Sequence, residues 1–147
     1  MNVETVIADG ARAESEVWAR ALRDQPAWEP IFSALAPRAL ALGVETVYEA
    51  YLVHYGRPRL FLAPDADEAV LLGDYLYAHG LVRIAEAGGV TAVATMAELI
   101  SRCAALRADG SGGDEQAWVE AMRALGGEPD ADALAGALAL HCARVAA

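Results

Sequence analysis

The amino-acid sequence predicts an all-α protein, a single-domain bundle of about six helices that spans residues 1–147. Alanine, leucine and glutamate, which favour helices, are abundant in a chain that is 56% hydrophobic. β-branched residues never form the alternating pattern of a strand, and Gly, Pro and Asp recur at intervals that suit helix ends. A chain of this length can bury one hydrophobic core without disulfides or a metal.

The first half of the chain contains two predicted long helices. One covers about residues 11–24 and ends before Pro26, which leaves residues 1–10 outside it as a segment that is free to be disordered. The other covers about residues 38–55. It ends at the Gly-Arg-Pro sequence of residues 56–58, because proline disfavours helical geometry at the residue before it.

The central helix of the bundle is predicted to run from Asp65 to Gly88. Pro64 and the carboxylates after it form a strong start, since proline suits the first turn and carboxylates suit the partial positive end of a helix. Gly88 and Gly89 supply the left-handed cap that ends it. Three more helices follow over residues 91–107, 114–125 and 131–145, and the glycine-rich residues 109–113 form a flexible connection.

The charge of the chain excludes two classes of partner. Its 21 acidic and 11 basic residues give a formal net charge of −10, so nucleic acids and anionic membrane surfaces would repel it. The longest apolar stretch, residues 70–84, is interrupted by Asp74 and Arg83, and residues 1–5 lack the features of a secretory signal. We therefore expect a cytoplasmic protein without a transmembrane segment.

Residue types that commonly carry chemistry form no recognisable site in this sequence. His54, His79 and His141 lie on three different predicted helices, without the spacing of a metal site. The Asp-x-Asp pairs at 65–67 and 130–132 lie at helix starts, where capping explains a carboxylate without a ligand. No nucleophile with a positioned base is identifiable. We therefore predict no catalytic residue, no metal site and no cofactor in this chain.

The middle of the central helix combines two glycines with one carboxylate. Gly73 and Gly80 share a face with Tyr77 and lead to Ile84, and their small size permits another helix to approach closely. Asp74 lies among apolar residues, so we predict that it is buried and needs a specific partner, inside the chain or across an interface. An arginine, a tyrosine hydroxyl or a helix end would satisfy it.

Two short motifs in this region resemble those of a known enzyme family. Gly-Arg-Pro at 56–58 and Gly-Asp-Tyr-Leu at 73–76 resemble the corresponding segment of trans-polyprenyl diphosphate synthases, with the same spacing. Residues 50–54 look like the end of the helix that precedes the first aspartate-rich motif of that family. The resemblance covers about residues 44–107 and implies a truncated isoprenoid synthase fold.

The sequence departs from the family where the metal-binding motif should begin. In the family, Asp-Asp-x-x-Asp follows the helix, and its carboxylates hold the magnesium ions that grip the diphosphate. Here His54 and Tyr55 lead directly to Gly56, and no second aspartate-rich motif follows. The resemblance therefore implies a protein that is not an enzyme on its own, with magnesium only in a catalytic partner.

The short chain and its missing motifs resemble the small, non-catalytic subunit of heterodimeric long-chain prenyl diphosphate synthases. Those enzymes make menaquinone side chains in isoprenoid biosynthesis, and a full-length synthase subunit would be the partner. Because subunits of the family pair through their long central helices, the resemblance places the partner interface on residues 65–88. The interface residues expected there are Gly73, Asp74, Tyr77, Gly80 and Ile84.

Two other hypotheses stay open at this point. The chain could be a stand-alone homodimer that binds an apolar or isoprenoid ligand in a tunnel between residues 38–55 and 65–88. Tyr48, Tyr51 and Tyr75 would line such a tunnel, or they belong to the core. The chain could instead be an unrelated helical interaction domain whose motifs match by chance.

Overall fold

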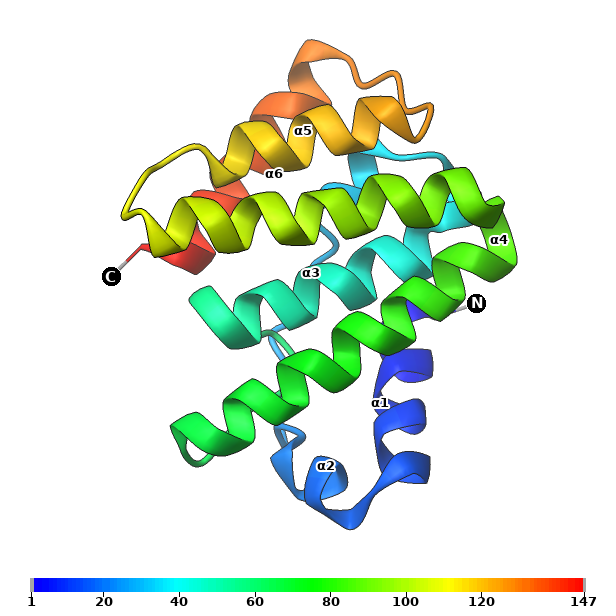
Figure 1. The fold of residues 1–147 in the computed structure, drawn as a ribbon. Coiled ribbons are helices and arrows are strands. Elements are labelled where there is room, and N and C mark those ends of the chain that lie inside the picture. The colour runs from blue at the N-terminus through cyan, green and yellow to red at the C-terminus, as the bar shows by residue number, and fades with distance from the viewer. Residues whose placement is uncertain (1, 147) are drawn as a thin grey trace.

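Helix α3 (Ala41–Tyr55) lies at the centre of the molecule, because its sequence is apolar on nearly every side. In the computed structural model, which describes residues 2–146, every residue from Gly43 to Leu52 is buried. The other helices surround α3 (Figure 1). The predicted all-α fold is confirmed, since the described residues form six α-helices and no strand.

Helix α4 (Ala66–Ala108) is the longest element, and it bends at Gly89. Gly89 has a φ of 75°, in the left-handed region that favours glycine. The bend divides α4 into a first arm, residues 66–88, and a second arm, residues 90–108, with α3 lying between them (Figure 1). The predicted start is confirmed, because the Asp65 side chain caps the helix. The predicted break after residue 88 is confirmed as a bend.

The N-terminal region differs from the prediction. The sequence leaves residues 1–10 free to be disordered, but residues 3–10 belong to helix α1 (Val3–Glu14), which buries apolar side chains against the core, and residue 1 lies outside the described residues. The helix expected over residues 11–24 is interrupted at Ser15, whose extended backbone has φ −165° and ψ 144°. The Ser15 hydroxyl accepts a hydrogen bond from a backbone amide and so starts a separate helix, α2 (Glu16–Ala21).

The remaining helices agree closely with the predicted segments. Two short 3-10 helices, Phe32–Leu35 and Arg38–Leu40, precede α3, so its α-helical part begins at Ala41 rather than at residue 38. Helix α5 (Asp114–Ala124) lies beside the second arm, and helix α6 (Ala131–Val145) packs against α3 and the first 3-10 helix (Figure 1).

Two hydrophobic clusters meet at α3. The larger one joins α3 to the second arm, α5 and α6, and it includes Phe32 and Trp118. The smaller one joins α3 to α1, α2 and the first arm, and it includes Ile7 and Leu72. Each arm of α4 therefore covers α3 with one of its sides.

Candidate functional site

The inner side of the first arm packs closely on α3. A Cβ atom placed on Gly80 would lie 2.5 Å from Cγ2 of Val47, and one placed on Gly43 would lie 2.6 Å from the side chain of Ile84. The glycines thus permit a close helix approach, as predicted, but the approaching helix belongs to the same chain. Gly80 and Ile84 are buried against α3 of the same chain, so neither is on the exposed surface of the described residues.

Three further residues of the predicted interface gather around His54 at the end of α3. Gly73 lies against the imidazole ring, Tyr77 stacks on it with the ring centroids 5.2 Å apart, and Asp74 Oδ1 lies 3.6 Å from its Nε2. Burial lowers the pKa of His54 despite the nearby Asp74 carboxylate, so the ring is neutral at pH 7. Gly73 is buried and Tyr77 packs against the core, so these two also face inward.

Asp74 lies beside His54 at the edge of the first arm, and its carboxylate is open to solvent. Its side chain is 67% exposed, which contradicts the prediction that it is buried. The reason is the helical register: Leu72, Leu76 and Gly80 form the buried side of the arm, and Asp74 points away from them. The carboxylate therefore needs no partner inside the chain.

The three tyrosines expected in a tunnel or in the core differ in burial. Tyr48 and Tyr51 are at most 1% exposed, and the Tyr48 hydroxyl is hydrogen-bonded to Nδ1 of His141 at 2.8 Å. Tyr75 is half-buried against Trp18 at the side of the first arm. Because α3 and the first arm touch along their glycines, these described residues line no tunnel between the two helices.

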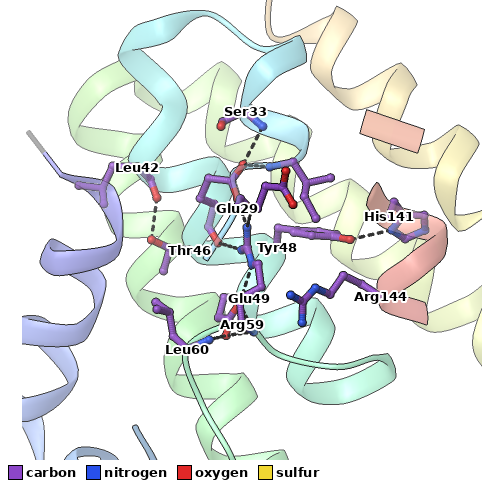
Figure 2. A network of polar contacts seen from close by, with 12 residues as sticks. Glu29, Ser33, Leu42, Thr46, Tyr48, Glu49, Arg59, Leu60, His141 and Arg144 are labelled. Carbon is purple, nitrogen blue, oxygen red and sulfur yellow. Dashed lines mark hydrogen bonds and ion pairs between the residues drawn. The ribbon is translucent and has the colours of Figure 1, made fainter. Parts of the chain in front are cut away.

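A buried ion cluster that was not predicted from the sequence lies beside α3 (Figure 2). The Arg59 side chain is fully buried and contacts two carboxylates of α3. Its Nη1 lies 2.5 Å from Glu45 Oε1, and its Nε lies 3.0 Å from Glu49 Oε1. Cζ of Arg59 also lies 4.1 Å from the centroid of the Trp28 ring, a favourable cation–π contact.

The two carboxylates of this cluster also hold the loops on either side of α3. Glu45 accepts hydrogen bonds from two backbone amides of the preceding loop, and Glu49 accepts from two amides of the following loop. All four carboxylate oxygens thus have partners in the chain, and both side chains are shielded from solvent. The cluster is a structural clamp. Its signal in the sequence is a pair of glutamates one turn apart in an apolar helix.

A second polar cluster lies beside a pocket of about 450 Å³ that is lined by residues 110–113 and His141. Oδ2 of Asp114 accepts hydrogen bonds from the Tyr51 hydroxyl at 2.5 Å and from Arg107 Nε at 2.8 Å. Burial lowers the pKa of His141, so this ring is also neutral at pH 7. The sequence gives no signal for this cluster, because its members are distant in the chain.

This second cluster supports packing rather than catalysis. Arg107, Tyr51 and Asp114 bond to one another and so tie α5 to α3 and to the second arm. Oδ1 of Asp114 is buried without a partner, beyond the reach of solvent. Within residues 2–146, no group of three or more His, Cys, Asp or Glu side chains is placed to hold a metal ion.

The outer side of the first arm is largely apolar and uncovered. We define the outer face as six exposed residues that recur every three or four positions: Asp67, Leu71, Asp74, Ala78, Val82 and Ala85. Leu71 is 59% exposed and Val82 is 55% exposed. By length and composition α4 is able to cross a membrane, and only 22% of its most apolar 18-residue stretch is buried. The outer face is therefore the candidate functional site.

Comparisons with protein-family models, with curated proteins and with solved structures gave no significant match. The two sequence motifs nevertheless lie together in the fold. Gly56, in the first motif, ends α3, while Gly73, in the second, touches His54 in the last turn of α3. The outer face begins just before the second motif and contains its Asp74.

Proposed function

We propose that this protein is a non-catalytic subunit of a heteromeric trans-prenyltransferase that makes long-chain prenyl diphosphates. The partner is a full-length synthase subunit that carries both aspartate-rich motifs and the magnesium ions. In this role the protein acts in the cytoplasm, in the synthesis of side chains such as that of menaquinone. The resemblance of residues 56–58 and 73–76 to the synthases supports the proposal.

The uncovered outer face is the observation that carries the proposal. Leu71 and Val82 are both more than half exposed on a helix whose opposite side already covers α3. Exposed apolar surface is unfavourable in water, and a continuous strip of it on a helix commonly marks a protein interface. In the complex the catalytic subunit would cover this strip. This chain would thereby stabilise the catalytic subunit or set the length of its product.

The end of α3 supports a non-catalytic role. Helix α3 stops at Tyr55, and the chain passes from His54 through Tyr55 directly to Gly56, where the synthases continue with their first aspartate-rich motif. The clustered carboxylates that magnesium requires are therefore missing at this point of the sequence. We therefore assign the chemistry to the partner and the helix surface to this chain.

The test combines the purified chain with a full-length synthase from the same organism. Prenyl transfer from an allylic diphosphate to isopentenyl diphosphate is measured with magnesium, and we expect the activity or the product length to change when the chain is present. Val82→Glu on the outer face should abolish this effect, whereas Ala94→Glu on the exposed side of the second arm should preserve it. Equal activity and equal product length with and without the chain would contradict the proposal.

A pull-down tests the same proposal without choosing the synthase in advance. The tagged chain is recovered from its native cell extract, its companions are identified by mass spectrometry, and the eluate is assayed for prenyl transfer. We expect a synthase with both aspartate-rich motifs and measurable activity. Recovery of the chain alone, without activity, would count against a heteromeric role.

A further inference from the structure

Asp74 is the charged residue at the middle of the outer face. Leu71 precedes it by one turn, Ala78 follows by one turn and Val82 by two turns, and all three are exposed. Any partner that covers these apolar side chains also removes Asp74 from water. The cost of that step depends on which group the partner places opposite the carboxylate.

No cation of the described chain neutralises Asp74. The nearest basic group is Nε2 of His54 at 3.6 Å, and that ring is neutral at pH 7 because burial lowers its pKa. Arg83 of the same arm donates a hydrogen bond to Thr46 Oγ1 at 2.9 Å, so it is directed toward α3. When a partner covers the outer face, the Asp74 carboxylate therefore enters the interface without a paired cation from its own chain.

The other exposed charges along this side of the arm are negative as well. Asp67 lies near its start, Glu86 lies near its end, and both are exposed. Two copies of the outer face would thus bring together apolar side chains and carboxylates, without a cation to pair with Asp74. Burying an unpaired charge is unfavourable, and like charges add repulsion, so this face is poorly suited to a symmetric dimer.

We infer that the outer face docks on a different protein, whose apolar helix surface presents an arginine or lysine opposite Asp74. The inference rests on the proposed function, which names that protein as the catalytic synthase subunit. Asp74 then determines specificity in both directions: its charge pairs with the cation of the correct partner and disfavours a second copy of this chain.

Self-association of the purified chain tests the exclusion of a second copy. In sedimentation equilibrium the wild type should be monomeric, whereas Asp74→Leu should self-associate at least about tenfold more tightly because it completes the apolar strip. Glu128→Leu, the matched control in the exposed loop before α6, should stay monomeric. An Asp74→Leu protein no more associated than the wild type would overturn the inference. Flotation of the wild type with phosphatidylcholine vesicles would also overturn the inference, because a lipid surface rather than a protein would then cover the outer face.

Binding to the catalytic subunit tests the cation opposite Asp74. In isothermal titration calorimetry, Asp74→Asn, which keeps the shape and removes the charge, should raise the Kd by about tenfold or more. Asp132→Asn on the exposed start of α6 should leave the Kd unchanged. Equal Kd values for Asp74→Asn and the wild type would overturn the inference and leave the proposed function intact. Failure of the wild type to bind would instead refute the proposed function, and with it the partner named here.

Discussion

Replacement of Arg59 should destabilise the protein more than any surface change, because its cation sits between two buried carboxylates. The variant Arg59→Met keeps a long apolar side chain but leaves Glu45 and Glu49 without their cation. Removing one partner of a buried ion pair costs about 3–5 kcal/mol. The amides of the two loops still donate to both carboxylates, so we expect a loss of this size rather than complete unfolding.

The loss is measured by urea denaturation and by thermal melting, both followed by circular dichroism. For a chain of this size, about 3–5 kcal/mol corresponds to a drop in Tm of roughly 6–20 °C. The matched control is Arg38→Met at an exposed arginine, which should change the free energy of unfolding by less than about 0.5 kcal/mol. An Arg59→Met protein as stable as the Arg38→Met control would refute the view that the ion cluster clamps the loops to α3.

Three further predictions follow from the packing, the outer face and the buried histidines. Gly80→Ala places a Cβ 2.5 Å from Val47 Cγ2 and should lower the free energy of unfolding by about 1–3 kcal/mol in urea denaturation; an unchanged value would contradict the close packing. Leu71→Asp should keep that free energy within about 0.5 kcal/mol but weaken binding to the catalytic subunit in calorimetry. Burial lowers the pKa values of His54 and His141, so the unfolded state binds more protons and stability should fall as the pH drops from about 7 to 5. The double variant His54→Gln and His141→Gln should weaken this pH dependence, and equal slopes would argue against it.

The predicted helices agree best with the structure where capping residues mark their starts. Asp65 and Asp130 cap α4 and α6 with their side chains, and both starts were predicted from these residues. Ser15 caps α2 in the same way, but the apolar periodicity around it continues on both sides and conceals the break. Helix α1 was missed because its apolar side chains are few and become stabilised only by long-range packing on the core.

Four of the five residues predicted for a partner interface face the inside of the chain, and only Asp74 lies on the outer face. Both sides of the arm are apolar, so the periodicity of the sequence does not say which side is buried in the chain. The spacing of Gly73 and Gly80 correctly predicted a close helix approach. Only the structure shows that the approaching helix is α3, which carries Gly43 to receive Ile84.

The polar clusters lay beyond prediction because their members are far apart in sequence. Tyr51 and Asp114 are separated by 63 positions, and Tyr48 and His141 by 93 positions. A buried glutamate on an apolar helix indicates that a cation is near, but it does not identify which of 11 arginines provides it. In the structure Arg59 provides this cation, because the loop after α3 turns back along the helix.

The two apolar sides of the first arm have different consequences for function. A monomer gains stability from the inner side alone, where Leu72 and Leu76 cover α3. Leu71 and Val82 contribute little to folding in their exposed positions, so the fold itself does not require an apolar outer face. Such a face also raises the risk of self-association, which the net charge of −10 and the central Asp74 both oppose. An apolar strip that is protected against its own copies suits a chain that must stay available for a different subunit.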